Sequence, residues 1–341
     1  MAFRAQIRFR GYLPYALALP ALLASIALSS PQVWAQTDYP NRPVRIVSDS
    51  PVGSANDVTA RILADRLGKI WGRQIIILNQ PGAGGGISAR VAASAPADGY
   101  TLYIAAASVF LALRGGPGVA PNLPAEVPRD FVPIGLILQE PLFIAASPKA
   151  GINSLVEMLA QAKKRPNELS YASTGRGRLT HLAMEQLQER AGVKLRLVPY
   201  AGGPAEAMGD IISDRVDLII DGYGGLAGSM QGGIIKALAS TWSERLPGLE
   251  NLPTVAETLP DYFVAGWGVM LAPLGTPEAI VRKVSADLRT ALEDKDLVAR
   301  FAVDGAFPTY KTPEETVAFI QSQQKVWRPI QEKIAREAQA Q

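Results

Sequence analysis

The sequence predicts an α/β protein whose exported part is large enough for two domains. Short apolar runs alternate with segments of helical periodicity in both halves of the chain, as in open sheets covered by helices. These runs are numerous enough for two sheets. The chain has 341 residues, a length at which two domains can each bury a core. Beyond residue 36, no stretch approaches the roughly 20 apolar residues of a membrane-spanning helix.

The first 35 residues have the pattern of a secretory signal peptide. Three arginines lie within the first ten residues, residues 13–28 are apolar, and residues 33–35 supply the small-residue pattern that precedes cleavage. We therefore expect cleavage after Ala35 and a periplasmic location. Removing the three arginines lowers the formal net charge from +3 to 0, so the charge indicates no nucleic-acid partner. The chain has no cysteine, which excludes disulfides.

The elements of the first half follow a strand–helix–strand order. Strands are predicted at residues 44–47, 75–78 and 101–107. The run at 75–78 is uniformly apolar, as in a parallel strand covered on both faces. One helix carries apolar residues at helical spacing from Val58 to Leu67 and stops at Gly68, and another begins near Ile87.

The rest of the chain repeats this order. Ser154 and Glu157 predict a capping box for one helix, and Thr312 and Glu315 cap a last helix that ends near Ala335. The remaining predicted elements are strands at 169–172, 193–197 and 216–220, and helices that begin after Thr180, at Pro204 and at Thr276-Pro277.

Few residues suit catalysis. His181 is the only histidine, which excludes zinc sites and histidine-based nucleophilic schemes and leaves His181 as a packed or capping residue. No Gly-x-Ser-x-Gly motif occurs. The glycine-rich run at 81–86 lacks the third glycine of a dinucleotide loop, because Ile87 stands there. That run is either a tight turn or a ligand-facing loop. We expect no metal and no cofactor.

Two loops precede helices in a way that suits an anion. Residues 171–182 read YASTGRGRLTHL, and residues 50–57 read SPVGSAND. A helix N-terminus exposes N–H groups and carries partial positive charge, so a Gly/Ser/Thr-rich approach to it can hold a carboxylate. The same residues also serve as ordinary caps and turns. Asp57 or Asn56 is able to cap the helix after the earlier loop.

The order and spacing of ten short motifs carry a family resemblance from Tyr39 to about Trp327. The sequence resembles the extracytoplasmic receptors of tripartite tricarboxylate transporters, the Bug family. The matching segments are YPNRPVRI (39–46), DVTAR (57–61), NQPGAGG (79–85), DGYTL (98–102), DF (130–131), YAS (171–173), THL (180–182), VPY (198–200), VDL (216–218) and LPTVAE (252–257).

The resemblance implies a two-domain periplasmic-binding-protein fold of the Venus flytrap type. It implies two interdomain crossings, near residues 139–142 and 262–266. Domain one would then comprise residues 36–140 and 263–341, and domain two residues 141–262, with the ligand cleft between them. With Asp57, the candidate ligand-binding residues are Pro51, Val52, Gly53, Ser54, Ala107, Ser108, Ser173, Thr174, Gly175, Arg176, Gly177, Thr180 and Asp221.

The chain departs from the family pattern at several of these places. Residues 49–53 read DSPVG where the family usually has Pro-Phe-Pro-x-Gly, and residues 109–110 read VF where a Thr or Ser is usual. Residues 114–117 read RGGP near the usual Asn-Pro, and Gly222 replaces an asparagine after Asp221. These departures bear on which ligand is bound.

Arg176 and Arg178 stand where the family usually has small or polar residues. Because they are two residues apart in a glycine-containing loop, we expect at most one to point into the cleft. Arg176 is the candidate, and we expect the replacement of Arg178 to weaken ligand binding less than the replacement of Arg176.

The resemblance indicates a monomeric periplasmic receptor for a small carboxylate that works with integral membrane subunits. Two alternatives remain. An orphan sensor would use the same site with a different membrane partner, and an enzyme would need Asp57, Asp221 or the arginines as acid and base groups.

Overall fold

A computed structural model describes residue 1 and residues 38–112, 122–124, 126–303 and 305–339. The predicted signal peptide and the motif at 114–117 therefore lie almost wholly outside the described residues. Residues 39–341 form one compact unit. None of the helices in the described part of the chain is both long and apolar enough to cross a membrane.

Two sheets are joined through one long strand, β4 (Phe131–Ala146). In the first sheet the order is β2 (Ile75–Asn79), β1 (Val44–Ser48), β3 (Thr101–Ala106), β9 (Ala265–Pro273) and β4, and β10 (Phe307–Lys311) also pairs with β4. In the second sheet β4 is followed by β7 (Leu218–Gly222), β5 (Ser170–Ser173) and β6 (Arg196–Pro199), while β8 (Lys236–Ser240) pairs with β4.

The hydrogen-bonding partner of β4 changes in the middle of the strand. From Phe131 to Pro141, β4 pairs with β9, and from Leu142 to Ala146 it pairs with β7. β4 thus passes from one sheet into the other, and the chain returns to the first sheet through the segment between β8 and β9. β1 runs parallel to β2 and β3, and β5 runs parallel to β6 and β7.

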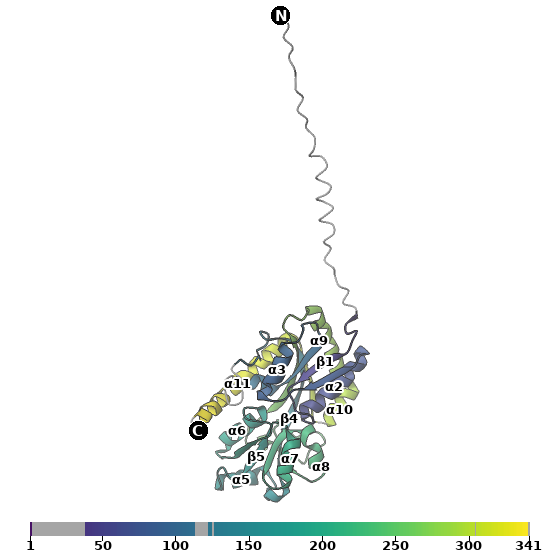
Figure 1. Cartoon of the computed structure of the whole chain (residues 1–341). Helices are drawn as coiled ribbons and strands as arrows, with labels where there is room; N and C mark the ends of the chain where they lie inside the picture. Colours follow the sequence, from purple (N-terminus) through teal and green to yellow (C-terminus); the bar gives the residue numbers. More distant parts are fainter. Residues whose placement is uncertain (2–37, 113–121, 125, 304, 340–341) are drawn as a thin grey trace. The chain divides into compact units, whose positions relative to one another are not determined.

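Helices surround both sheets (Figure 1). The helices in the first part of the chain are α2 (Ala55–Trp71), α3 (Gly86–Ala93) and α4 (Ala107–Leu111). The middle part contributes α5 (Leu155–Lys164), α6 (Leu179–Ala191), α7 (Pro204–Ile212) and α8 (Tyr223–Gln231). The last part contributes α9 (Glu278–Leu292), α10 (Lys295–Val303) and α11 (Pro313–Gln339). The α/β prediction is confirmed.

Some local predictions need correction. The strand β2 is not covered on both faces: it lies at the end of the first sheet, and Ile76 is 38% exposed. Apolar residues alone do not indicate whether a strand lies in the middle of its sheet or at the edge. Strand β6 begins at Arg196, three residues later than predicted. The Ser154 hydroxyl does accept from Glu157 N at 3.1 Å, but the Glu157 side chain accepts from Asn153 N, one residue before the expected partner.

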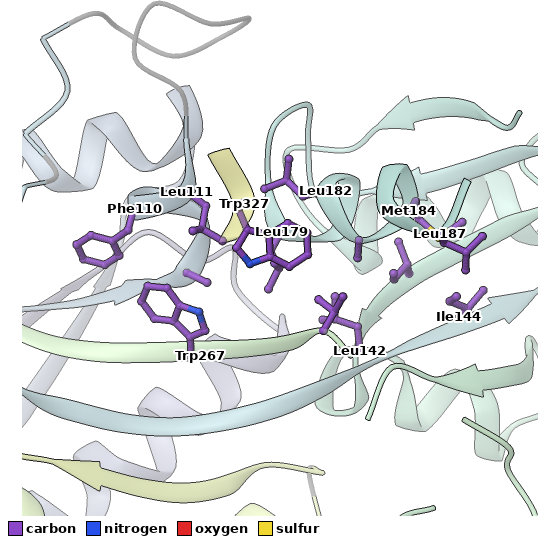
Figure 2. Packing of buried hydrophobic residues seen from close by; sticks show 14 of the residues in the cluster. Phe110, Leu111, Leu142, Ile144, Leu179, Leu182, Met184, Leu187, Trp267 and Trp327 are labelled. Carbon is purple, nitrogen blue, oxygen red and sulfur yellow. The ribbon is translucent and has the colours of Figure 1, made fainter. Parts of the chain in front are cut away.

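One hydrophobic cluster links the beginning of α6 to the first sheet. Trp267 of β9 stacks on Phe110 of α4 with ring centroids 5.5 Å apart, and Leu179 of α6 and Trp327 of α11 belong to the same buried cluster. Figure 2 shows these side chains together. Because the burial of such apolar surface is the main favourable contribution to folding, this cluster fixes the N-terminus of α6 against α4.

Candidate functional site

The first loop, residues 49–54 between β1 and α2, is held by a buried acid. Asp57 is 1% exposed, and its carboxylate accepts from Gly53 N at 2.9 Å, Asn79 Nδ2 at 2.8 Å and Arg61 Nε at 3.0 Å. Gly53 has a φ of +79°, which favours glycine. The expectation that Asp57 or Asn56 caps α2 is wrong: the N-cap is Ser54, with no side-chain cap hydrogen bond, and Asp57 lies in the first turn, where its carboxylate holds the loop instead. The hydrogen bonds that the Asp57 carboxylate accepts all come from neighbouring groups of the protein.

The second loop, residues 174–178 between β5 and α6, is held by hydroxyl groups. Thr180 Oγ1 lies 2.7 Å from Ser173 Oγ and 2.9 Å from Thr174 Oγ1, and it accepts from Thr174 N at 3.2 Å. Gly177 N donates to Nδ1 of His181 at 2.9 Å, and His181 is only 3% exposed. The lone histidine is thus a buried residue that fixes this loop, as predicted.

An ion pair joins the two loops. Arg178 Nη2 donates to Asp49 Oδ2 at 3.3 Å, with 12% of the Arg178 side chain and none of the Asp49 side chain exposed. Asp49 Oδ1 accepts from Ala106 N at 2.9 Å. A second link follows directly, because Leu179 N donates to Oγ of Ser108 at 3.0 Å. The N-terminus of α6 is therefore tied to both the first loop and α4.

Two cavities lie along these loops. The large cavity has a volume of about 380 Å³ and is lined by Asp49, Pro51, Pro81, Gly82, Ala83, Gly84, Thr174, Gly175, Arg176, Arg178 and Ala201. The small cavity has a volume of about 40 Å³ and is lined by Ser50, Pro51, Ser54, Asn56, Ala106, Ala107, Ser108, Glu140, Leu142, Thr174, Arg178, Leu179, Thr180, Asp221, Gly266 and Trp267. Pro51, Thr174 and Arg178 line both cavities.

Most of the predicted site residues lie at these cavities. Those that line at least one are Pro51, Ser54, Ala107, Ser108, Thr174, Gly175, Arg176, Thr180 and Asp221. Ser173 lines a further cavity of about 10 Å³ beside Asp221. Val52, Gly53, Asp57 and Gly177 line none of these three. Val52 is instead 65% exposed, and Asp57 is turned toward Arg61 and Asn79.

The expectation for the two arginines needs correction. Both Arg176 and Arg178 line the large cavity, although we expected at most one of them to reach the site. Arg178 is the more enclosed of the two and holds an ion pair, whereas Arg176 is exposed. Sequence spacing could not reveal this order, because the positive φ angles of Gly175 (+135°) and Gly177 (+78°) turn the loop between the two side chains.

The glycine-rich run that sequence reasoning left open lies at the large cavity, to which residues 81–84 contribute. Close packing accounts for one of its glycines: a Cβ on Gly85 would lie 2.5 Å from Cγ2 of Val109 and 3.4 Å from Oδ2 of Asp49. The run therefore approaches the acid of the ion pair directly. Sequence reasoning missed Asp49 itself, whose only signal was its departure from the family pattern.

Asp221 is the buried acid of the small cavity. Burial raises the pKa of Asp221 to about 7, although the hydrogen bond from Gly222 N and the charge of Arg178 act in the opposite direction. Asp221 can therefore change its protonation near neutral pH. Within the described residues, no group of three or more His, Cys, Asp or Glu side chains could hold a metal ion. The site as described offers hydroxyls, two arginines and helix N-termini, which is chemistry suited to binding an organic anion.

Comparisons with known proteins agree with this geometry. The family described as "Tripartite tricarboxylate transporter family receptor" matches residues 59–336. Protein BugT of Bordetella pertussis is 34% identical over 310 residues, which cover 90% of this chain and 93% of BugT.

Solved structures extend the likeness to the fold. The periplasmic binding protein BugD is 32% identical with a TM-score of 0.78, over 87% of this chain and 98% of BugD. A protein of R. palustris solved with adipate is 29% identical with a TM-score of 0.80, over 87% and 98% of the two chains. MatC of Rhodopseudomonas palustris, solved with bound malate, is 28% identical with a TM-score of 0.76, over 86% and 99%.

The family match covers more than half of the chain, and the similar solved structures have the fold that the sequence resemblance implied. The chain belongs to the tripartite tricarboxylate transporter receptor family, as a periplasmic solute-binding protein of the Bug type with the two-domain Venus flytrap fold.

Proposed function

We propose that this protein captures a small organic carboxylate in the periplasm and presents it to the integral membrane subunits of a tripartite transporter. One observation carries the proposal: the N-termini of α2 and α6, together with Arg176 and Arg178, converge on the same pair of cavities. Helix N-termini and arginines both favour carboxylates. The relatives solved with adipate and malate support the same ligand class.

The proposal includes the organisation of the chain. Residues 1–35 are a signal peptide cleaved after Ala35, domain one comprises residues 36–140 and 263–341, and domain two comprises residues 141–262. The change of pairing partner at Pro141 and Leu142 supports the first crossing. The protein acts as a monomer that binds its ligand without catalysing a reaction. Its ligand-binding residues are those predicted residues that line the cavities, together with Arg178.

A thermal-shift screen of the purified protein tests the ligand class. A ligand that binds only the native state stabilises it by RT ln(1 + [L]/Kd), or about 2.7 kcal/mol at a hundredfold excess over Kd. We expect at least one mono-, di- or tricarboxylate of three to six carbons to raise the unfolding midpoint. Stabilisation by a nucleotide or an uncharged solute, with no response to any acid, would contradict the proposal.

Small-angle scattering tests the mode of binding. A cleft between two domains that are joined by two crossings closes by a hinge when a ligand bridges its two sides. We expect the radius of gyration to fall when the acid found in the screen saturates the protein. An unchanged radius at saturation would indicate a preformed site instead.

A further inference from the structure

The small cavity has buried N–H donors that lack acceptors. Arg178 Nε and Trp267 Nε1 are both buried without a hydrogen-bond partner, and both residues line this cavity. A buried donor that has given up its water needs another acceptor, because leaving it unpaired lowers stability. Two unpaired donors at one small cavity point to an acceptor with two oxygen atoms, such as a carboxylate.

Both donors are held in position by the surrounding protein. Arg178 is fixed by its ion pair with Asp49, which leaves Nε available. Trp267 stacks on Phe110 at 5.5 Å and meets the edge of Phe319 at 5.3 Å, and the first of these contacts is visible in Figure 2. Donors that are already fixed lose little freedom when a ligand binds.

Asp221 adds acceptor capacity to the same cavity. Its Oδ1 accepts from Gly222 N at 2.7 Å, and this is the carboxyl group's single hydrogen bond among the described residues. Only 6% of Asp221 is exposed, so water from the bulk solvent reaches it poorly. Its neighbours in the cavity wall include Arg178 and Glu140. A ligand group that donates a hydrogen bond would satisfy this acid.

We propose, on the basis of the function proposed above, that the small cavity recognises a carboxylate with a hydrogen-bond donor on the adjacent carbon, a hydroxyl or an ammonium group. Nε of Arg178 and Nε1 of Trp267 donate to the carboxylate, and Asp221 accepts from the neighbouring substituent. The small cavity, at about 40 Å³, has room for this head group alone. The remainder of the ligand extends past Arg178 and Thr174 into the large cavity.

Matched sets of acids test the proposal by calorimetric titration of the purified protein. The sets are propionate, lactate and alanine; succinate, malate and aspartate; and glutarate, 2-hydroxyglutarate and glutamate. In at least one set we expect the hydroxy or the amino acid to bind at least about tenfold more tightly than the unsubstituted acid. Equal affinities within every set that binds would overturn the proposal. Failure of every carboxylate, including adipate, to bind would overturn the proposed function as well.

Variants of Asp221 identify the substituent. Asp221→Ala removes the acceptor and is expected to abolish the preference for the substituted acid. Asp221→Asn keeps an amide oxygen but loses the negative charge. We expect it to weaken an amino acid by at least about thirtyfold and a hydroxy acid by less than about threefold. Circular dichroism confirms the fold of each variant, and a preference that survives Asp221→Ala would refute the role of Asp221.

A pair of tryptophan variants tests the carboxylate contact. Trp267→Phe keeps a ring for stacking on Phe110 but loses the N–H donor, so we expect about a tenfold loss of affinity for substituted and unsubstituted acids alike. Trp327→Phe is the matched control: Trp327 is buried in the same cluster and does not line the small cavity. Wild-type affinity in Trp267→Phe, or an equal loss in both variants, would show that the indole N–H does not bind the carboxylate.

Discussion

The first loop and the second loop each lead from a parallel strand into a helix, but their charges are arranged differently. Beside the first loop, Asp57 of α2 is buried and accepts hydrogen bonds from Gly53, Asn79 and Arg61. In the second loop the groups that hold the backbone are neutral hydroxyls, and two arginine side chains extend from this backbone.

Because of this difference, the acid beside the first loop supports the backbone, whereas the arginines of the second loop are available to a ligand. Asp57 uses its carboxylate to hold the first loop, so this acid sets the backbone shape and has no free capacity for a ligand. The second loop fixes its backbone with Thr180 and His181, which leaves the cation of Arg178 to bridge the cavities. Two strand–loop–helix segments of similar sequence can therefore have different roles. The role depends on which polar groups are hydrogen-bonded to one another within the loop and which are left for a ligand.

The largest effect is expected from Asp57. Asp57→Ala leaves the N–H of Gly53 and one N–H of the Asn79 side-chain amide without an acceptor, and it removes the carboxylate partner of Arg61, so we expect the free energy of unfolding to fall by about 3–4 kcal/mol. Chemical denaturation measures this loss. Asp65→Ala is the control, because Asp65 pairs with Lys69 and Arg300 at the surface and should cost no more than about 1 kcal/mol. Similar losses in the two variants would contradict the supporting role of the first loop.

The second prediction compares the buried acids near the two loops. Several groups donate hydrogen bonds to the carboxylate of Asp57, whereas a single group donates to that of Asp221. Burial raises the pKa of Asp221 to about 7. Between the unfolded-state pKa near 4 and the folded-state value, the folded protein holds a proton that the unfolded chain releases. Stability is then lost as the pH rises toward 7, by about 1.4 kcal/mol per pH unit at most, and levels off above it.

Asp221→Asn removes this titration. We expect the unfolding free energy of the variant, relative to that of the wild type, to increase by about 2–3 kcal/mol from pH 5 to pH 8. Denaturant titrations at several pH values measure the difference. A difference that does not vary with pH would show that Asp221 keeps its usual pKa in the folded protein.

The third prediction concerns the two arginines. Arg178 lines both cavities and is largely enclosed, so we expect Arg178→Ala to weaken carboxylate binding by at least about thirtyfold, or 2 kcal/mol. Arg176 is exposed and lines the large cavity alone, so Arg176→Ala should cost less than about threefold. Calorimetric titration with the acid found by the screen decides the order. The reverse order would restore the interpretation that the sequence alone favoured.

Local signals in the sequence predicted much of the fold. The capping residues Ser154 and Thr312 lie where their helices begin, and the alternation of strands and helices gave the α/β class. The strands β4 and β9 were missed, although β4 joins the two sheets and β9 pairs with it. Their apolar runs carry no sign of which distant strands they pair with, because pairing depends on contacts far apart in the sequence.

Some of the residues that line the two cavities could be singled out from the sequence for a similar reason. Glycines and hydroxyls near helix starts mark Thr174, Gly175 and Thr180 in the sequence itself, since their role is local. The contributions of Asp49 and Trp267 depend on residues more than a hundred positions away, namely Arg178 and Phe110. No periodicity or spacing in the sequence indicates such contacts between distant residues.

The smallest effect is expected from a pair of threonines that sit on the helices after the two loops. Thr180 Oγ1 accepts from Thr174 N and contacts two hydroxyls, so Thr180→Val leaves a backbone donor of the second loop without its acceptor. We expect a loss of about 1 kcal/mol in unfolding free energy and a few-fold loss of ligand affinity. Thr59 of α2 is also buried, but its hydroxyl donates only to carbonyl oxygens of its own helix, those of Ala55 and Asn56. Since helix carbonyls also take part in the helix ladder, Thr59→Val should change stability by less than about 0.5 kcal/mol and leave affinity unchanged. Denaturation and calorimetry of both variants measure the contrast. If the two substitutions prove equivalent, the hydroxyls do not hold the second loop, and its shape must come from the glycines and His181 alone.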